Sequence, residues 1–437
     1  MPVSVAIVGS GPSGYYTADA LLKADLDVRI DVIERLPAPF GLIRYGVAPD
    51  HQTTKNVQRA FDKTAQSDGV GYYGNVEIGR DISVDELRSL YDAVVFAVGS
   101  PYDRKLGIPG EDKQGVLGSA EFVGWYNAHP DFRDLDPPLD TENVVVIGVG
   151  NVAIDIARVL VKTREEMQES DIVDYSLDAI QASPITDVYM LGRRGPVEAK
   201  FTNVELREMG KLENAVSIVD ADQLPDGVVD DSLSDRDRRL KERNLATLKE
   251  FIAFKPDDKP KRVHFHFYAT PVEILGGERV EAVKVERTKV ENGRAVGTGE
   301  FYEIPCSLVL AAIGYQSMPL DGVPFDERGG VFANDDGRIA NGVYAAGWVK
   351  RGPTGVIATN RPDGQNAAKL IAEDFAGGGT KPGREALEAA LQAKGVRWVG
   401  YPDWLKLNEH EVGNARPGSP RAKVARVADM LAVIDGG

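Results

Sequence analysis

The sequence predicts an α/β fold built from two dinucleotide-binding (Rossmann-like) domains. An apolar strand, a glycine-rich turn and a helix-compatible segment follow one another twice, with the turns at residues 9–14 and 148–153. Glycine occurs 46 times, whereas average usage of about 7% would give roughly 31. The 437 residues are enough for two to three domains at about 150 residues each.

A complete βαβ unit surrounds the first glycine turn. Apolar, β-branched composition predicts strands over residues 3–8 and 28–33, with a helix over 15–23 between them. Glu34 follows the second strand, 25 positions after Gly9 and close to where dinucleotide-binding units carry an acidic residue. We therefore place the adenosine half of a dinucleotide here and expect Glu34 to accept hydrogen bonds from ribose hydroxyls.

Three glycines of this turn have separate physical roles. The first permits the tight turn, the second lets the backbone approach a pyrophosphate at the helix N-terminus, and the third lets the helix pack closely on the strand. Gly9, Gly11 and Gly14 occupy these positions in the first turn.

The same pattern predicts a second dinucleotide site. Strands are expected over residues 143–147 and 188–191, with a helix over 154–163, and the turn contains Gly148 and Gly150.

The end of the second module indicates which coenzyme it takes. Its strand over 188–191 is followed by Arg193 and Arg194 and not by a carboxylate. A carboxylate would repel a ribose 2′-phosphate, whereas two guanidinium groups bind it through charge-assisted, bidentate hydrogen bonds. The second site is therefore expected to prefer NADPH to NADH.

Three further segments are apolar and end in glycine: residues 93–98, 308–313 and 343–346. They are predicted to be strands. A helix is expected from near Gly355 to Phe375, and the charged stretches 220–243 and 255–262 predict exposed helix and loop.

The charge balance excludes several classes of partner. Lys and Arg number 51 against 67 Asp and Glu, which gives a formal net charge of −16. A field of that sign repels phosphate backbones and anionic lipids, and the longest apolar runs fall far short of a membrane-spanning helix of about 18 residues or more. We expect neither nucleic-acid binding nor membrane insertion.

Cysteine content limits the redox chemistry. Cys306 is the only cysteine, so an intramolecular disulfide, a redox dithiol, a CxxC zinc site and a protein-bound iron-sulfur cluster are excluded. Redox chemistry would need a bound organic cofactor, no metal site is expected, and Cys306 is predicted to be a buried thiol. Met1 leads directly into the first strand without a signal-peptide pattern, and a cytoplasmic location is expected.

Six blocks stand in a fixed order along nearly the full length of the sequence. They are IVGSGPSG at 7–14, PFGLIRYGVAPDH at 39–51, GIPGED at 107–112, GNVAIDIAR at 150–158, GRRGP at 192–196 with ELRE at 205–208, and GWVKRGPTGVI at 347–357. In this set the sequence resembles the adrenodoxin-reductase-type ferredoxin-NADP reductases.

The resemblance implies both a domain layout and a reaction. An FAD-binding domain is expected in two parts, 1–104 and 315–437, with an NADP-binding domain at 105–314 inserted between them. The implied activity is that of a ferredoxin-NADP(+) reductase with the cofactors FAD and NADP. It transfers hydride from NADPH to FAD and then single electrons to a ferredoxin, its iron-sulfur partner.

The resemblance also carries individual residues over by position. The implied FAD contacts, besides Gly9, Gly11 and Gly14, are Ser13, Glu34, Leu42, Ile82, Trp348, Gly355, Val356 and Ile357. The implied NADP contacts, besides Gly148 and Gly150, are Asn151, Val152, Arg193, Arg194 and Glu205. The helix expected after Gly355 would direct its first amides at the pyrimidine end of the flavin.

Some of these residues have a structural alternative. His51 and Glu208 are the candidates for a catalytic role, in which they would relay a proton or position the nicotinamide. The alternative for each residue is a purely structural role, in which its side chain stabilises the local backbone. Asp155 is either functional or a cap or loop anchor. Trp348 contacts the flavin or only packs in the core.

Docking and function leave alternatives open as well. The basic stretch 236–243, with Arg207 and Lys211, either meets an acidic ferredoxin or is a solvated helix face. A flavin-dependent monooxygenase would share both dinucleotide sites, and a docking or sensing subunit would bind nucleotides without turnover.

Overall fold

A computed structural model describes residues 1–229 and 233–436, and the chain divides into two units. Unit 1 comprises Met1–Tyr102, Asn127–Arg133 and Tyr315–Gly437, and unit 2 comprises Asp103–Tyr126 and Asp134–Gly314. The limits of the FAD and NADP domains, defined by the ligands they hold, stay predictions.

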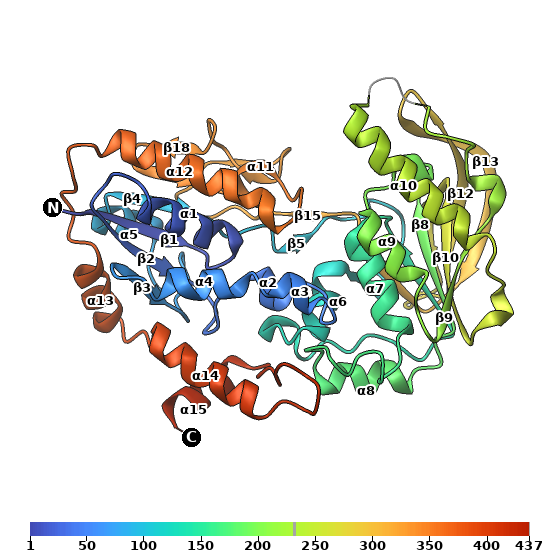
Figure 1. Ribbon diagram of the computed structural model, residues 1–437, viewed down its shortest axis with the longest axis horizontal. Helices are drawn as coiled ribbons and strands as arrows, with labels where there is room; N and C mark the ends of the chain where they lie inside the picture. Colours follow the sequence, from blue (N-terminus) through green and yellow to red (C-terminus); the bar gives the residue numbers. More distant parts are fainter. Residues whose placement is uncertain (230–232, 437) are drawn as a thin grey trace. The chain divides into compact units, whose positions relative to one another are not determined.

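Unit 1 is built on a six-stranded sheet (Figure 1). Its order is β18 (Arg338–Ala340), β19 (Val343–Ala345), β4 (Ala93–Phe96), β1 (Val3–Val8), β2 (Val28–Ile33) and β3 (Val70–Tyr73). All pairs are parallel except β18 with β19. The strands predicted over 3–8 and 28–33 are confirmed to the residue, and the apolar runs alternate between two buried faces.

Helices cover both faces of this sheet. Their bounds are α1 (Pro12–Leu22), α2 (Leu42–Tyr45), α3 (Gln52–Lys55), α4 (Gln58–Ala65), α5 (Val84–Leu90), α11 (Trp348–Arg351), α12 (Asn360–Asp374), α13 (Arg384–Ala393), α14 (Tyr401–Gly413) and α15 (Val427–Asp435). The core with α1 and α12 includes residues of α14 and α15, and the opposite core includes α5 and α13. In Figure 1 the orange α12 lies beside the blue α1, so the ends of the sequence meet in one unit.

Unit 2 has a second six-stranded sheet, and all of its strands are parallel. Its order is β6 (Val116–Gly118), β14 (Leu308–Ala311), β7 (Asn143–Ile147), β8 (Asp187–Gly192), β10 (Lys261–Phe267) and β9 (Ala215–Val219). The helices are α6 (Ser119–Tyr126), α7 (Asn151–Val161), α8 (Asp174–Ala182), α9 (Asn203–Met209) and α10 (Asp235–Phe251). An antiparallel sheet of β11 (Ala269–Leu275), β12 (Ala282–Glu291) and β13 (Arg294–Pro305) shares an apolar core with β7, β8 and β14. The predicted α/β class with two Rossmann-like parts is confirmed.

Two local predictions need correction. Lys261 and Arg262, expected in a loop, begin β10, because Val263 and the next two odd-numbered residues are buried and the charged start belongs to an alternating strand. The charged stretch 220–243 does enter α10, but its residues 230–232 lie outside the described part of the chain.

The helix expected from near Gly355 begins later. A 3-10 turn (Ile357–Thr359) comes first, and α12 starts at Asn360. Thr359 donates both its amide and its hydroxyl to Val356 O, at 3.0 and 2.6 Å, which closes a tighter turn than an α-helix. The amides expected to face the flavin therefore belong to this short turn.

Two expectations from composition concern the whole chain. Across residues 1–229 and 233–436, no helix has the length and apolar character needed to cross a bilayer. Cys306 is buried as predicted, and burial raises the pKa of its thiol to about 12.

A buried ion pair fixes the carboxyl-terminal helices to the amino-terminal part of unit 1. Arg44 on α2 donates from Nη1 and Nη2 to Glu411 of α14, at 2.8 and 2.5 Å, and their side chains are 3% and 0% exposed. The Arg44 guanidinium also lies over the rings of Tyr45 and Trp404. Burial alone would raise the pKa of Glu411, but the charge and hydrogen bonds of Arg44 keep it below its ordinary value.

We predict that Glu411→Gln lowers the free energy of unfolding by about 3–5 kcal/mol, because a buried guanidinium loses its counter-charge. Urea denaturation of the purified protein, followed by circular dichroism, measures the change. The control is Asp435→Asn, which breaks the exposed Arg397–Asp435 pair and should cost less than about 1 kcal/mol. Equal losses in the two variants would contradict the prediction.

Candidate functional site

The glycines of the first turn divide into two that the fold needs and one that it does not. Gly9 has φ +107°, and a Cβ there would lie 2.5 Å from Ala97 O. A Cβ on Gly14 would lie 2.1 Å from Gly9 O. At Gly11, by contrast, no described atom outside residues 10–12 lies within 4 Å of the Cβ position. Gly11 therefore leaves space open at the N-terminus of α1, which fits an approaching pyrophosphate.

Glu34 holds the first turn in shape. Its Oε2 accepts the Ser10 hydroxyl at 2.6 Å and the Ser10 amide at 3.0 Å, and its Oε1 accepts the Leu36 amide at 3.2 Å. A carboxylate has about four acceptor positions, so Glu34 can anchor the loop and still accept a ribose hydroxyl.

The carboxyl-terminal part of unit 1 reaches this turn through Gly347. Gly347 has φ +76°, and a Cβ there would lie 1.8 Å from Ser13 Oγ. The same Ser13 hydroxyl donates to Asn360 Oδ1 at 3.1 Å. Sequence reasoning predicted Ser13 but missed Asn360, since no local pattern links two residues 347 positions apart.

The segment after Gly347 is fixed by Arg351 and Trp348. Arg351 Nε donates to Asp363 at 2.6 Å, and its Nη1 donates to Thr354 O at 2.5 Å. The half-buried Trp348 ring stacks on Tyr315 with centroids 6.0 Å apart, and its indole N–H also donates to Thr354 O. Trp348 thus has a structural role, and its predicted flavin contact stays a prediction.

The remaining predicted FAD contacts differ in exposure. Leu42 and Val356 are large apolar residues that stay 41% and 53% exposed, whereas the Ile82 side chain is buried in the core beside α5 and α13. Ile82 O accepts the Gly79 amide. Leu42 and Val356 offer uncovered apolar surface, and Ile82 contributes to packing.

The second turn repeats the geometry of the first. Gly148 has φ +142°, and a Cβ there would lie 2.3 Å from Ala312 O. At Gly150, no described atom outside residues 149–151 lies within 4 Å of the Cβ position. Among the described residues, no side chain caps the N-terminus of α1 or α7, and neither helix has an acidic residue in its first turn. Both helix N-termini therefore suit an anion.

Arg193 and Arg194 lie at the carboxyl end of β8, next to the turn at Gly148. Arg193 is exposed and Arg194 is half-buried. Arg194 Nη1 donates to Gly293 O, at the turn between β12 and β13, at 3.2 Å. The cations predicted for the 2′-phosphate thus stand at the same edge of the sheet as the open Gly150 turn.

A fully buried arginine gathers the acidic residues of α7 and α9. Arg158 lies 2.9 Å from Asp155, 3.4 Å from Glu208 and 3.8 Å from Glu205. Asp155 therefore has an ion-pair partner on its own helix, and Glu205 and Glu208 share that partner. The sequence signal that could have indicated this cluster was an arginine on the apolar face of α7, among Ile154, Ala157 and Val161.

Asn151 and His51 have defined backbone positions. Asn151 Oδ1 accepts the amide of Thr202, the N-cap of α9, at 2.8 Å, and so joins α9 to the glycine turn. His51 is the N-cap residue of α3 in unit 1, and its amide donates to Ala48 O. Glu208 is in unit 2, and the catalytic roles of His51 and Glu208 stay predictions. Val152 follows Asn151 in the first turn of α7 and is half-buried.

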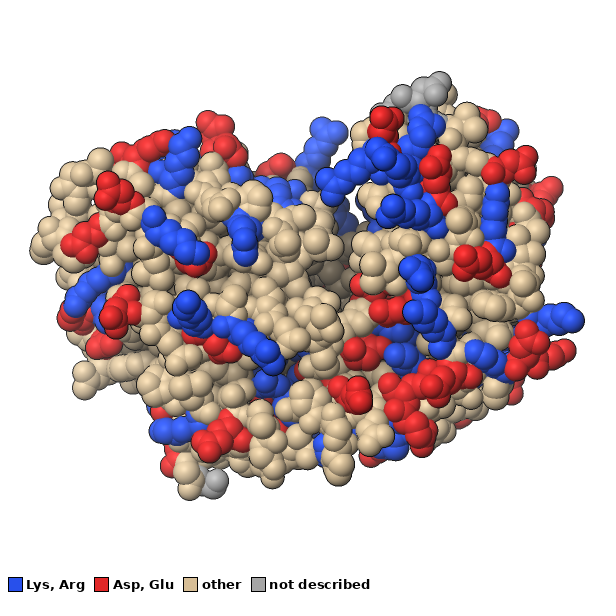
Figure 2. Space-filling model, in the orientation of Figure 1, with Lys and Arg blue, Asp and Glu red and all other residues tan. Residues whose placement is uncertain are grey.

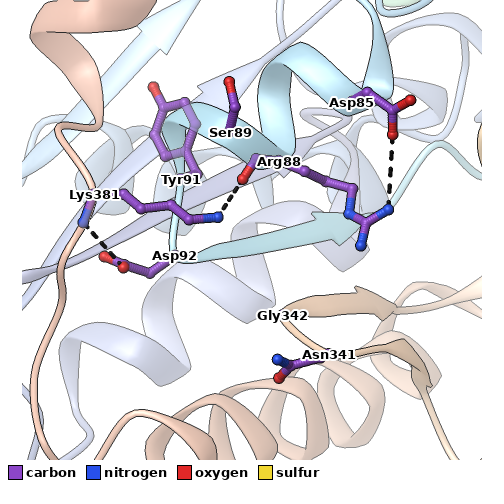
Figure 3. A pocket seen from close by; sticks show the side chains of 8 residues that line it. All are labelled: Asp85, Arg88, Ser89, Tyr91, Asp92, Asn341, Gly342 and Lys381. Carbon is purple, nitrogen blue, oxygen red and sulfur yellow. Dashed lines mark hydrogen bonds and ion pairs between the residues drawn. The ribbon is translucent and has the colours of Figure 1, made fainter.

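A cavity of about 380 Å³ lies elsewhere in unit 1 (Figure 3). It is lined by Asp85, Arg88, Ser89, Tyr91, Asp92, Asn341, Gly342 and Lys381. Asp92 precedes β4, so the cavity opens at the amino end of that strand, opposite the glycine turn. Asp92 accepts the amides of Ser4, Thr380 and Lys381, and the Lys381 ammonium donates to Arg88 O. These polar groups hold the fold together, and the first glycine turn lies at the opposite, carboxyl end of the strands of this sheet.

Comparison with known proteins identifies a matching family and several similar proteins. Residues 3–178 match the family described as "Pyridine nucleotide-disulphide oxidoreductase". The chain is 40% identical to mouse NADPH:adrenodoxin oxidoreductase, mitochondrial, over 98% of this chain and 91% of the relative. It is 39% identical to Mycobacterium tuberculosis NADPH-ferredoxin reductase FprA over 99% of both chains. The structure of that FprA in complex with NADPH superposes with a TM-score of 0.94 at 37% identity, over the full length of both. The chain therefore belongs to the family of NADPH:adrenodoxin oxidoreductases and NADPH-ferredoxin reductases.

Proposed function

We propose that this protein is an FAD-dependent oxidoreductase that transfers electrons between NADPH and a ferredoxin. The observation that carries the proposal is the pair of open glycine turns, at Gly11 and Gly150. One lies beside the carboxylate of Glu34, and the other lies beside Arg193 and Arg194. Full-length similarity to reductases that are named for NADPH and for ferredoxin or adrenodoxin supports it.

The residues of each unit suit one dinucleotide. In unit 1, the α1 amides and Gly11 would hold the FAD pyrophosphate, Glu34 its ribose, and Leu42 and Val356 would offer apolar contact. In unit 2, Gly150 and the α7 amides would hold the NADPH pyrophosphate. Arg193 and Arg194 would bind its 2′-phosphate.

Bound FAD would supply the conversion between a two-electron hydride donor and a one-electron acceptor. The protein's task is then to bind, orient and exclude, and no side chain has to form a bond to the substrate. We place His51 and Glu208 as the side chains that would hold or move a proton. The Arg158 guanidinium, 3.4 Å from Glu208, would orient its carboxylate.

An exposed basic helix face in unit 2 suits an acidic ferredoxin. Arg236, Arg239 and Arg243 are exposed at spacings of three and four residues and so share one face of α10. Arg207 is exposed on α9, and Lys211 just beyond it. Figure 2 shows Lys and Arg side chains gathered over this part of unit 2, with acidic ones among them. A chain with net charge −16 can attract an acidic protein only through such a local surface.

We also propose a cytoplasmic location. The single, buried Cys306 leaves the chain without an intramolecular disulfide, as is usual in a reducing compartment.

The direct test is to purify the protein, record a flavin spectrum, and follow NADPH-driven reduction of a ferredoxin. Rapid ferredoxin reduction supports the proposal. Slow transfer with steady release of hydrogen peroxide would favour the monooxygenase, and binding of both nucleotides without turnover would favour a docking or sensing subunit.

The coenzyme prediction concerns the double variant Arg193→Gln, Arg194→Gln. Each lost charge-assisted hydrogen bond is worth about 1.5–3 kcal/mol, so kcat/KM for NADPH should fall at least roughly 10- to 100-fold. The value for NADH, which has no 2′-phosphate, should change little. Steady-state kinetics with both coenzymes measures this, and equal losses would overturn the assignment.

The two glycine turns allow a matched pair of variants. Gly11 has φ −75° and Gly150 has φ −120°, and both Cβ positions are open among the described atoms, so valine fits either backbone. Gly11→Val should give a protein without bound flavin, because the side chain fills the space of the pyrophosphate. Gly150→Val should keep the flavin and lose NADPH affinity. Flavin absorbance and NADPH titration would show the reverse pattern if the two sites were exchanged.

The docking prediction concerns salt and one charge reversal. Ferredoxin reduction should slow steeply between about 0.05 and 0.5 M salt, where the screening length falls from above 10 Å to under 5 Å. Arg239→Glu should raise the KM for ferredoxin at least about tenfold and leave quinone reduction nearly unchanged. The control is Lys369→Glu, on an exposed part of α12 in unit 1, which should alter neither. A ferredoxin rate insensitive to salt would remove the electrostatic surface from the proposal.

A further inference from the structure

The loop that carries Arg193 and Arg194 is held from the antiparallel sheet of unit 2. Thr288, on β12, donates its hydroxyl to Arg193 O at 2.8 Å. Tyr268, between β10 and β11, donates its amide to Arg194 O at 3.0 Å. Both peptide carbonyls of the arginine pair are thus fixed by residues more than seventy positions away in the sequence.

Thr288 and Tyr268 are themselves joined. The Thr288 amide donates to Tyr268 O at 2.8 Å, next to an irregularity in the register of β12 with β13. Tyr268 has φ +53°, in the left-handed region of backbone conformation that residues other than glycine rarely adopt. Thr288 is only 8% exposed. A buried hydroxyl, an irregular strand and an unusual backbone conformation therefore lie together against the two adjacent peptides of the arginine loop.

The turn between β12 and β13 reaches the same loop. Asn292 and Gly293 have φ +50° and +72°, as a two-residue type I′ hairpin requires. The carbonyl of Gly293 accepts Arg194 Nη1 at 3.2 Å. A guanidinium has five N–H groups, so this bond orients Arg194 and leaves donors for another ligand.

We propose that Thr288 and the Asn292–Gly293 turn are positioning residues for recognition of the 2′-phosphate of NADPH. This rests on the proposed function, in which Arg193 and Arg194 bind that phosphate. A guanidinium binds a phosphate through two parallel hydrogen bonds only over a narrow range of orientations. By fixing the Arg193 and Arg194 carbonyls, and one Arg194 nitrogen, the antiparallel sheet and the residue that precedes it set the direction in which both side chains leave the backbone.

The experiment compares Thr288→Val with Thr298→Val. Valine keeps the branched shape and removes the hydroxyl. Thr298, on the neighbouring strand of the same hairpin, is exposed; its hydroxyl donates to Arg287 O at 2.9 Å and accepts the Glu300 amide at 3.3 Å. Its variant therefore loses hydroxyl bonds to the backbone of the same sheet, away from the arginine loop. Calorimetric titration of the flavin-loaded proteins uses two probes: adenosine 2′,5′-bisphosphate, which has the 2′-phosphate, and 5′-AMP, which lacks it.

The Kd of Thr288→Val for adenosine 2′,5′-bisphosphate should rise about 3- to 10-fold, the effect of one lost hydrogen bond. Its Kd for 5′-AMP should stay the same. Thr288→Ser, which keeps the hydroxyl, should bind both probes like the wild type, and Thr298→Val should too. If the valine variant does not yield folded protein, Thr288→Ala gives the same comparison.

The outcomes separate this inference from the proposed function. A wild type that binds both probes equally would overturn the arginine assignment and the positioning role together. If the double arginine variant loses the preference for the bisphosphate and Thr288→Val retains it, only the positioning role is overturned. Equal weakening of both probes by Thr288→Val would also overturn it, because Thr288 would then support the whole site and not the 2′-phosphate.

Discussion

Unit 1 depends on the close approach of two backbone segments at Gly347 and Ser13. The Ser13 hydroxyl stands where a Cβ on residue 347 would be, and it bonds to Asn360. This contact brings α12 against α1 and the loop at 347–357 against the first glycine turn. The Arg44–Glu411 pair likewise holds α14 against the amino-terminal part of unit 1, because Arg44 lies on the short helix that begins with Leu42. The proposed flavin site is thus assembled from the two ends of the sequence.

The two glycine turns show how one backbone geometry is adapted to two ligands. In both, the first glycine approaches the carbonyl of the residue that follows the neighbouring strand, and the middle glycine leaves open space before a helix. They differ in the groups that surround them. Glu34 anchors the first turn, whereas Asn151 joins the second to α9 and the antiparallel sheet holds its arginine loop. The chemistry of each site is therefore set by segments outside the common βαβ unit.

This difference explains how much of the molecule could be predicted from its sequence. Strands such as 3–8 and 143–147 were predicted to the residue, because short apolar, β-branched runs bounded by glycine turns are local signals. The roles of Gly9, Gly14 and Gly148 were local for the same reason. The Arg158 cluster and the Thr288 bond to Arg193 were not predicted, since each joins segments whose proximity only the fold creates. The 3-10 turn before α12 was missed because the Thr359 bonds to Val356 compete locally with helix.

The insertion of unit 2 has a consequence for synthesis of the chain on the ribosome. The described strands of the unit 2 sheets are complete once Ala311 has been made, whereas unit 1 still lacks β19 and α12 at that point. At about 5–20 residues per second, the sixty-odd residues needed to reach the end of α12 take several seconds. During that time the edge of β4 that later pairs with β19 is open, and the apolar face of α1 that later packs on α12 is uncovered. Unit 2 can thus finish folding before unit 1, although synthesis of unit 1 begins first. The incomplete sheet of unit 1 is therefore the part of the nascent chain with most need of protection from aggregation.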